Sequence, residues 1–397
     1  MGKTLEGIRV LDLASYIAGP FCCMLLADHG AEVIRVEPPG GKVDRETGPF
    51  LPNGLAATYG FSIQRNKRNI TLDFKTANGR RLLDELVAKT DVVVHNFPPG
   101  TVEATLLEYD RLSAVNPALI VAAVSGFGQT GPYARRSCFD AVAQAMSGAM
   151  SITGYPGTPP LKDGVTFVDF QTAARTAFGV MLALYERRTS GRGQLVDIAL
   201  FDGAMSMMVS LGCAAEYRLL GEVRKPVGNC GFYAYVGSRR ARDGYISINI
   251  VGNGQWRRMC RVMGREDLLG DPRFRDNLNR FRHYPDVDAV LDEWIGDKTV
   301  AEALEILQQA NIPSGPVNDI PAALSEPQVE AREMIVDLDC PGVGKAPVAG
   351  VCIKLSRTPG SVDRRASLLG EDNGAIYGGL LGYGPDDLAR LQQEKTI

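Results

Sequence analysis

The sequence predicts an α/β fold, in which a large domain with a mostly parallel sheet is joined to a smaller α+β domain. Up to Ser125, short apolar runs alternate with helical patterns, as they do when helices cover both faces of a parallel sheet. Between residues 223 and 321 the pattern changes to an antiparallel pair of strands followed by helices. A chain of 397 residues can form two or three domains. We therefore expect a large domain in residues 1–222, a small domain in residues 223–321 and a return to the large domain in residues 322–397.

The elements of the large domain follow from hydrophobic periodicity and turn residues. Residues 8–13 predict a short buried strand, and Pro20 begins a helix that Gly30 ends. Further strands are predicted at 31–37, 70–73, 91–96, 119–125 and 194–199, and helices at 78–89 and 202–220. The apolar run around Asp169, from Phe167 to Val180, predicts a buried helix.

The small domain is expected to begin with the segments FYAYVGSR and GYISINIV, which ARDG joins into an antiparallel pair. Helices are expected around Trp256, around Trp294 and at residues 301–309, and the proline-rich segment NIPSGPVNDIP leads out of the domain. The C-terminal part predicts a helix, strands near Ile335 and Val351 and a final amphipathic helix. We expect this part to pack on the large domain.

Composition argues against several classes of function. A net charge of -3 and a pI near 5.8 predict neither a nucleic-acid-binding surface nor a basic membrane patch. No apolar run approaches the roughly 20 residues of a membrane span. The eight cysteines are scattered and form no C-x-x-C pair, so we expect neither a disulfide framework nor a metal site. Because the N-terminus lacks an apolar signal core, a cytoplasmic protein is expected.

The segment SGFGQTG at residues 125–131 has the glycine spacing of a dinucleotide-binding loop. It follows the fifth predicted strand instead of the first, and it continues into Pro132 and Arg135. We therefore interpret it as a glycine-rich active-site turn and not as a nicotinamide or flavin site. The sequence also has no G-x-x-x-x-G-K-[ST] loop, so ATP-driven chemistry is not predicted.

Asp169 is an acidic residue in an apolar setting at the start of a predicted helix. It could cap the helix by accepting free backbone N–H groups. It could also be a nucleophile that the helix dipole keeps ionised at neutral pH. The chain has only three histidines, His29, His95 and His283, so a Ser-His-Asp triad or a histidine-rich metal site has few ways to form. A carboxylate nucleophile is then the simplest chemistry.

Many segments are similar, in order along the chain, to one enzyme family. They are LEGIRVLDLASYIAGPFCCMLLADHGAEVIRVEPPGG, NKRNITLDFK, DVVVHNFPPG, VSGFGQTGPY, FDAVAQAMSG, ALYERRTSGRGQLVDIALFDG, DGYISINIVGNGQW, IPSGPVNDI and LLGEDN. With these segments the chain resembles the class III CoA-transferases, the family of formyl-CoA:oxalate and carnitine CoA-transferases. The resemblance implies a Rossmann-like large domain, an inserted small domain, and two chains interlocked as rings in a homodimer. A heteromer with a homologous chain is an alternative.

The resemblance also implies the chemistry. Asp169 falls on the catalytic aspartate, which attacks an acyl-CoA thioester to form an anhydride and then an aspartyl-CoA thioester, from which CoA passes to an acceptor acid. Coenzyme A is then a co-substrate, and no permanently bound cofactor is expected. The glycine loop that closes over the aspartate in formyl-CoA transferase is shorter and only partly glycine here, which argues against oxalate specificity. Succinyl-CoA or another dicarboxylyl-CoA is then an open alternative as donor.

The same resemblance assigns coenzyme A contacts to Ile17, Ala18, Arg35, Leu72, Lys75, Asn96 and Phe97. Gly252, Asn253 and Gly254 fall on that glycine loop and are candidates for a lid. Pro38 and Ser137 stand where formyl-CoA transferase has basic residues, so the nucleotide contacts are expected to be distributed differently.

Two other functions remain open. The α-methylacyl-CoA racemases of the same family use a histidine immediately before the aspartate that corresponds to Asp140, and this chain has Phe139 there. The missing base argues against an acyl-CoA racemase or isomerase. The second alternative is a non-catalytic subunit that pairs with a homologous active chain.

Overall fold

The computed structural model describes residues 2–397, which form two compact units. The larger unit contains the chain up to Gly148, Asp163–Gly212 and Pro327–Ile397, and the smaller unit contains Ala149–Lys162 and Cys213–Glu326. The chain thus enters the smaller unit twice, first as a short segment that the sequence assigns to the large domain. The domain limits at residues 222 and 321 stay predictions.

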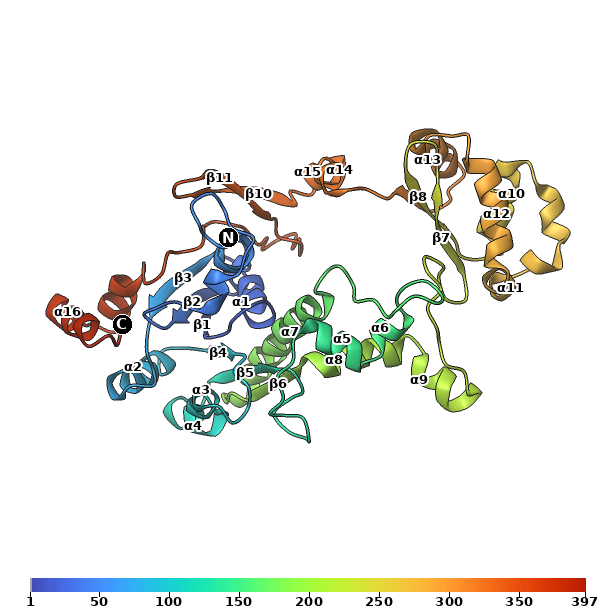
Figure 1. Cartoon of the computed structure of the whole chain (residues 1–397). Helices are drawn as coiled ribbons and strands as arrows, with labels where there is room; N and C mark the ends of the chain where they lie inside the picture. Colours follow the sequence, from blue (N-terminus) through green and yellow to red (C-terminus); the bar gives the residue numbers. More distant parts are fainter. Residues whose placement is uncertain (1) are drawn as a thin grey trace. The chain divides into compact units, whose positions relative to one another are not determined.

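A six-stranded parallel sheet forms the centre of the larger unit (Figure 1). Its order is β3-β2-β1-β4-β5-β6, with bounds β1 Arg9–Asp12, β2 Glu32–Glu37, β3 Lys67–Thr71, β4 Val92–His95, β5 Ile120–Ser125 and β6 Leu195–Ala199. The predicted α/β class with a parallel sheet is confirmed. The strand order reverses between β1 and β4, and parallel sheets of this kind bind ligands at the carboxyl ends of the strands beside that point.

Successive residues of the central strands face opposite sides of the sheet and bury two separate apolar clusters. Val10 and Val33 pack against α1 (Ala18–Asp28) and α7 (Phe167–Ser190). Leu11 and Ile34 point to the other face. That face is covered by α2 (Ala77–Val87), α4 (Tyr109–Val115), η7 (Gly374–Leu380) and α16 (Pro385–Gln393). The larger unit is therefore a three-layer structure.

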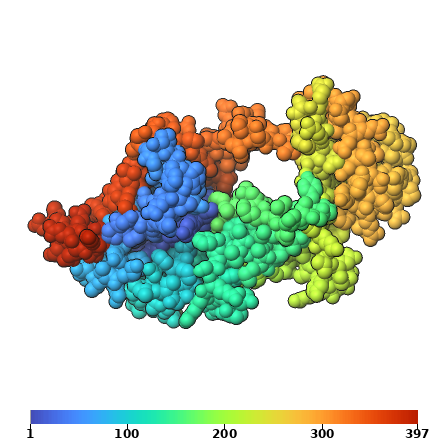
Figure 2. All heavy atoms as spheres, viewed as in Figure 1, coloured from blue at the N-terminus to red at the C-terminus, as the bar shows by residue number. Residues whose placement is uncertain are grey.

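The C-terminal residues belong to the core of the larger unit. Tyr377 is buried and donates a hydrogen bond from its hydroxyl to the carbonyl of Thr71 at 2.7 Å. In the space-filling view the red C-terminal atoms lie beside the blue N-terminal part of the chain (Figure 2). These contacts attach the C-terminal residues to the core of the larger unit, and the return of residues 322–397 to the large domain stays a prediction.

Strand β3 begins at Lys67 and not at Ile70, where the hydrophobic pattern places its start. Lys67 is only 1% exposed, yet its ammonium donates to Asp12, to Gln64 and to the carbonyl of Pro20, each at 2.8 Å. A buried charge with such partners is tolerated. The predicted boundary is wrong because these partners lie elsewhere in the chain.

The helix predicted over residues 202–220 is broken in the structure. Helix α8 (Leu200–Ser210) ends before Gly212, whose φ of +93° is rarely adopted by residues with side chains. The short α9 (Cys213–Ala215) and η4 (Glu216–Leu220) follow in the smaller unit.

Helix α7 is buried on one face only, whereas the sequence predicts a buried helix. Phe178, Leu182 and Tyr185 are 65%, 55% and 74% exposed. The larger unit also contains η1 (Val43–Glu46), η2 (Ala57–Phe61), η3 (Ser62–Gln64), α3 (Val102–Leu106), α5 (Asp140–Met146), α15 (Pro327–Ala331), β10 (Ile335–Cys340) and β11 (Gly344–Ala349).

The smaller unit is built on a three-stranded antiparallel sheet with one apolar cluster. The predicted pair is present as β7 (Tyr235–Arg240) and β8 (Tyr245–Ile250), and β9 (Ser314–Pro316) adds the third strand. Its other elements are α6 (Ala149–Ile152), α10 (Asn253–Met263), η5 (Glu266–Gly270), η6 (Pro272–Phe274), α11 (Asn277–Arg282), α12 (Tyr284–Ile295), α13 (Val300–Gln309) and α14 (Ile320–Leu324). Within residues 2–397, every helix is too short or too polar to cross a membrane.

Candidate active site

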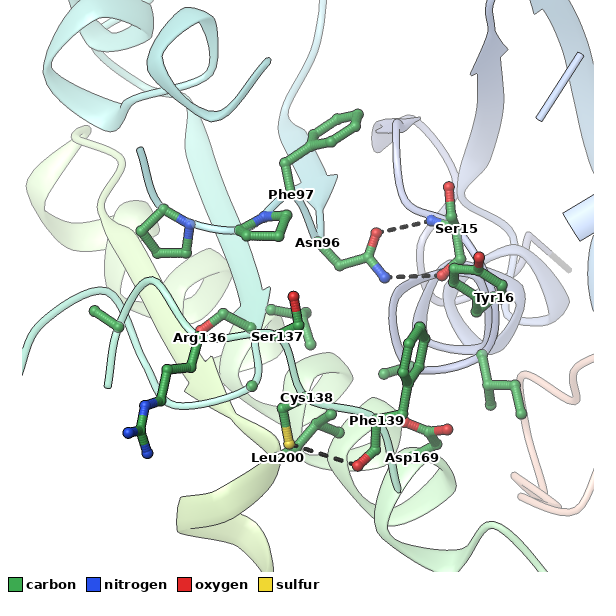
Figure 3. Close-up of a pocket in the computed structure, with 18 residues that line it drawn as sticks. Ser15, Tyr16, Asn96, Phe97, Arg136, Ser137, Cys138, Phe139, Asp169 and Leu200 are labelled. Carbon is green, nitrogen blue, oxygen red and sulfur yellow. Dashed lines mark hydrogen bonds between the residues drawn. The ribbon is translucent and has the colours of Figure 1, made fainter. Parts of the chain in front are cut away.

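The loops after β1, β4 and β5, together with the start of α7, surround a pocket of about 250 Å³ in the larger unit (Figure 3). The pocket lies at the carboxyl edge of the sheet, beside the point where the strand order reverses. Its walls are Ser15–Ala18, Asn96–Pro99, Val124–Gly126, Ala134, Arg136–Phe139, Asp169 and Leu200. Five residues selected from the sequence meet here, namely Ile17, Ala18, Asn96, Phe97 and Asp169.

Asp169 lies in the first turn of α7, but it does not cap this helix. The residue before the helix, Thr166, makes no side-chain cap bond. Instead, Oδ1 of Asp140 accepts the backbone N–H of Val168 at 2.8 Å and that of Asp169 at 3.3 Å. The interpretation of Asp169 as an N-cap is therefore wrong. The capping carboxylate comes from α5, and the carboxylate of Asp169 lines the pocket.

Burial, followed by the charge of Asp140, raises the pKa of Asp169 to about 7. The expectation that the helix dipole keeps this carboxyl fully ionised at neutral pH is therefore wrong, because desolvation and a like charge outweigh the dipole. Burial raises the pKa of the Cys138 thiol to about 11, with the charge of Asp169 adding to the effect. Burial and the charge of Asp169 also raise the pKa of Tyr59. The carboxyl of Asp169 is thus placed to gain or lose a proton near neutral pH.

Aromatic side chains form one wall beside Asp169. The ring of Tyr16 meets the ring of Phe139 edge-on at 5.3 Å and the ring of Tyr59 at 6.2 Å. Tyr16 has a φ of +62°, which is unusual for a residue with a side chain, and the carboxylate of Asp44 accepts its N–H at 3.3 Å. Phe139 brings an apolar ring, and no proton acceptor, to the position where racemases of this type use histidine.

Asn96 joins the loops that follow β1 and β4. Its side chain accepts the N–H of Ser15 at 2.8 Å and donates to the carbonyl of Ser15 at 2.8 Å (Figure 3). Ile17 and Ala18 follow directly at the start of α1, where the first N–H groups have no partner inside the helix. The side chain of Asn96 therefore ties the loop after β1 to the loop after β4 at the wall of the pocket.

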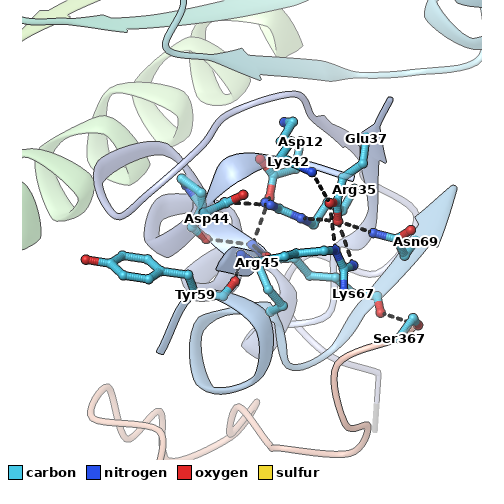
Figure 4. Close-up of polar contacts among 12 residues, drawn as sticks. Asp12, Arg35, Glu37, Lys42, Asp44, Arg45, Tyr59, Lys67, Asn69 and Ser367 are labelled. Carbon is cyan, nitrogen blue, oxygen red and sulfur yellow. Dashed lines mark hydrogen bonds and ion pairs between the residues drawn. The ribbon is translucent and has the colours of Figure 1, made fainter. Parts of the chain in front are cut away.

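Arg35 does not line the pocket. It is 2% exposed, and its guanidinium donates to Glu37 at 2.9 Å and to Asp44 at 2.7 Å (Figure 4). Lys42 belongs to the same cluster and donates from its ammonium to the carbonyl of Leu13 at 2.7 Å. Burial, followed by the charge of Arg35, lowers the pKa of Lys42 to about 8. Arg35 thus supports the loop after β1. Because its guanidinium is already paired with Glu37 and Asp44, Arg35 is poorly placed to bind a phosphate of coenzyme A.

Leu72 and Lys75 also lie outside the pocket lining. Leu72 is 1% exposed and belongs to the apolar cluster beneath α2. Lys75 is on the surface, with its Nζ 3.2 Å from a carboxylate oxygen of Glu103. Within residues 2–397, no group of three or more His, Cys, Asp or Glu side chains is arranged to hold a metal ion.

The candidate lid residues lie in the smaller unit and begin a helix. Gly252 has a φ of +104° and precedes α10, of which Asn253 and Gly254 are the first residues. The buried Arg280 donates to Oδ1 of Asn253 at 2.9 Å, and Oδ1 of Asn277 accepts the N–H of Gly252 at 2.8 Å. The prediction that these three residues form a loop is therefore wrong for Asn253 and Gly254, which are helical. Their role as a lid stays a prediction.

Sequence reasoning assigned no role here to Asp140, Asp44 or Arg136. Asp140 is the first residue of α5, and nothing in the sequence around it indicates a contact with α7. Arg136 lies close in sequence to the glycine-rich turn at residues 125–131, and this closeness could have marked it as a residue of the pocket. Its exposed guanidinium lies over the ring of Tyr133, 4.1 Å from the ring centre, at the rim of the pocket.

Residues 5–373 match CoA-transferase family III. The chain belongs to this family. The matched range includes the whole pocket and every candidate residue named above, so the resemblance seen in the sequence is confirmed. This family III chain is accordingly a CoA-transferase, an enzyme that uses CoA thioesters as substrates.

Relatives match the family III chain over nearly its full length. Succinyl-CoA–D-citramalate CoA-transferase of Chloroflexus aurantiacus is 37% identical, over 100% of this chain and 98% of that protein. The beta subunit of succinyl-CoA–L-malate CoA-transferase from the same organism is 35% identical, over 99% and 98%. The crystal structure of a CAIB/BAIF family protein from Brucella suis is similar with a TM-score of 0.83 and 34% identity, over 96% of this chain and 100% of that chain. The α/β fold is thus shared with that protein.

Proposed function

We propose that this enzyme moves CoA from a dicarboxylyl-CoA thioester to a carboxylic acid, with Asp169 as the covalent nucleophile. The observation that carries the proposal is the position of Asp169. Among the described residues that line the pocket, it supplies the single carboxylate, and it is half-buried with a pKa of about 7. A desolvated carboxylate in a pocket is a competent nucleophile toward a thioester.

The reaction is written as four exchanges at carbonyl carbons. The Asp169 carboxylate attacks the donor thioester, the C–S bond breaks, and CoA thiolate leaves an aspartyl-acyl anhydride. The thiolate attacks the aspartyl carbonyl and expels the donor carboxylate, giving an aspartyl-CoA thioester. The acceptor carboxylate attacks this thioester to form a second anhydride and releases the thiolate. The thiolate finally attacks the acceptor's acyl carbon, which gives the product thioester and restores Asp169.

No step requires a proton or an energy source. A thiol with a pKa near about 8.5 leaves readily as a thiolate. One thioester replaces another, so the overall exchange is close to thermoneutral. The proposed reaction therefore requires only a correctly positioned carboxylate and a binding pocket, and none of the described residues that line the pocket is a histidine or a lysine.

The proposed contacts of coenzyme A are the residues that meet in the pocket. Ile17 and Ala18 offer the start of α1, and Asn96 and Phe97 form the facing loop. Arg136 at the rim is suited to a phosphate, because a guanidinium forms paired hydrogen bonds with phosphate oxygens. We leave Arg35 and Leu72 out of this set because both are buried.

The donor class follows from the relatives. Two of them carry succinyl-CoA in their names, one with D-citramalate and one with L-malate as the other substrate. We propose a dicarboxylyl-CoA donor for this enzyme on that ground. A screen of acyl-CoA donors against carboxylic acids tests it, and transfer from monocarboxylyl donors alone contradicts it.

Replacing Asp169 tests the nucleophile. Asp169→Ala is expected to lower CoA transfer by about 10³-fold or more, as loss of a nucleophile commonly does. Asp202→Ala is the matched control, because Asp202 is an exposed acid in the first turn of α8 outside the pocket lining. Transfer at the wild-type rate by Asp169→Ala would sink the proposal.

Trapping the intermediate gives an independent test. The wild-type enzyme is incubated with acyl-CoA and hydroxylamine, and mass spectrometry is expected to find a hydroxamate on the peptide with Asp169. An unmodified peptide from active enzyme contradicts the covalent path. Deuterium uptake at the α-carbon without any acceptor acid would favour the racemase alternative, and an inactive purified chain would favour the non-catalytic subunit.

We further propose that two copies assemble as an interlocked homodimer, with the small domain inserted into the large one. The exposed apolar side chains of Phe178, Leu182 and Tyr185 on α7 support a covering partner. Light scattering should give twice the chain mass of 42.8 kDa. Since one relative is the beta subunit of a transferase, a monomer that gains activity with a homologous chain would favour the heteromer instead.

A further inference from the structure

Asp140 makes hydrogen bonds that no step of the proposed reaction uses. We infer that Asp140 is a positioning residue for Asp169, because it holds the first turn of α7 and sets a second carboxylate beside the first. This inference rests on the proposed role of Asp169 as the nucleophile.

Both carboxylate oxygens of Asp140 are occupied. Oδ1 accepts the N–H groups of Val168 and Asp169, and Oδ2 accepts from Nε2 of Gln144 at 2.5 Å. Gln144 is itself buried, and its Oε1 accepts the N–H of Asp163 at 2.9 Å. Asp140 is 5% exposed, so water cannot easily replace these bonds. The backbone of Asp169 is therefore fixed relative to α5.

The same arrangement controls the charge of Asp169. The titratable groups that face Asp169 are Asp140 from α5, Tyr59 from η2, Cys138 from the loop before α5, and Tyr16 from the loop after β1. None of these groups is cationic. Burial and the charge of Asp140 raise the pKa of Asp169 to about 7. A neutral hydrogen-bond acceptor would be enough to hold the backbone of Asp169. The negative charge of Asp140 therefore has an effect on Asp169 that is separate from positioning.

The charge has a consequence for attack on a thioester. When Asp169 attacks, the negative charge of its carboxylate is transferred to the acyl oxygen of the thioester. A like charge that opposes the ground state more than the transition state lowers the barrier between them. The same charge also favours protonation of Asp169, and a protonated Asp169 cannot attack the thioester. Asp140 is therefore expected to speed the attack above neutral pH and to reduce the rate below it.

The test compares Asp140→Asn and Asp140→Ala with the wild type in full pH profiles of kcat. The Asp140→Asn variant keeps the Oδ1 acceptor and removes the negative charge. The midpoint of its pH profile of kcat is therefore expected to lie at lower pH than in the wild type. The fraction of the plateau rate at pH 6, roughly one tenth for a midpoint near 7, is then expected to rise severalfold. Ala also removes the acceptor, and its plateau rate is expected to fall at least about tenfold below that of Asn.

Asp319→Asn is the control, because Asp319 caps α14 with its carboxylate and lies outside the pocket lining. Its profile should match the wild type. A wild-type midpoint in Asp140→Asn, or equal plateau rates in the Asn and Ala variants, overturns the inference. Hydroxamate formation on Asp169 is measured in the wild type in parallel. If that hydroxamate is present while Asp140→Asn behaves as wild type, the inference fails and the proposed function stands.

Discussion

Replacing Asp169 by Asn is expected to stabilise the folded protein at pH 8 while it abolishes CoA transfer. The pKa of Asp169 rises from 3.8 to about 7 on folding, through burial and then the charge of Asp140. Between those two values the folded state holds a proton that the unfolded chain has lost. Stability therefore falls as pH rises from about 4 to about 7, and the full cost is present above that window. A neutral Asn does not titrate and removes the cost.

The magnitude follows from the shift. One pKa unit corresponds to about 1.4 kcal/mol, so a shift from 3.8 to about 7 corresponds to about 4 kcal/mol. Asp169 is only partly buried, and solvent screening reduces this figure to about 2 kcal/mol. The Asn variant is expected to match the wild type in unfolding free energy near pH 4 and to exceed it by about 2 kcal/mol at pH 8.

Urea unfolding of both proteins at equal concentration, from about pH 4 to pH 8, measures this difference. All other titrating groups are common to the two proteins and cancel. Asp202→Asn is the control, because this exposed acid in the first turn of α8 should give no difference that depends on pH. An Asn variant of Asp169 that is less stable than wild type at pH 8, or a difference that stays constant with pH, refutes the reasoning.

Other predictions follow from the buried lysine, the rim arginine and a tight glycine. Lys67→Met leaves the buried carboxylate of Asp12 without its ammonium and should cost about 3–5 kcal/mol in urea unfolding, which wild-type stability would contradict. Arg136→Ala should raise KM for acyl-CoA about tenfold with kcat nearly unchanged, and a fall in kcat alone would argue against a phosphate contact. Gly193→Ala places a Cβ 1.7 Å from a backbone carbonyl oxygen and should lower Tm, whereas Gly164→Ala, in open space, should not; equal Tm values would contradict this.

The α/β class was predictable because it depends on local patterns. Strands such as Val92–His95 and Ile120–Ser125 are apolar except for their last residue, and buried parallel strands require such apolar runs whatever their neighbours are. Asn96 and Phe97 were found because they belong to DVVVHNFPPG, a segment that resembles the family. Asp169 was found because it is an acid at the start of an apolar helical run, and the resemblance to the family then gave it a catalytic role. Predicted strand boundaries were wrong where residues distant in sequence stabilise a buried polar side chain. The ammonium of Lys67, at the start of β3, is buried because it donates to Asp12 and to the carbonyl of Pro20.

The sequence by itself determined the parallel sheet, the family and the acid at the start of α7. The tertiary structure alone decided what surrounds that acid. Asp140 reaches Val168 across 28 residues of sequence, and Asp44 and Arg35 meet in a buried cluster. Desolvation and charge pairing depend on distances in space, to which spacing along the chain is no guide. For this reason Asp169 was recognised from the sequence. The carboxylate that caps α7, which is that of Asp140, and the raised pKa of Asp169 became apparent only from the tertiary structure.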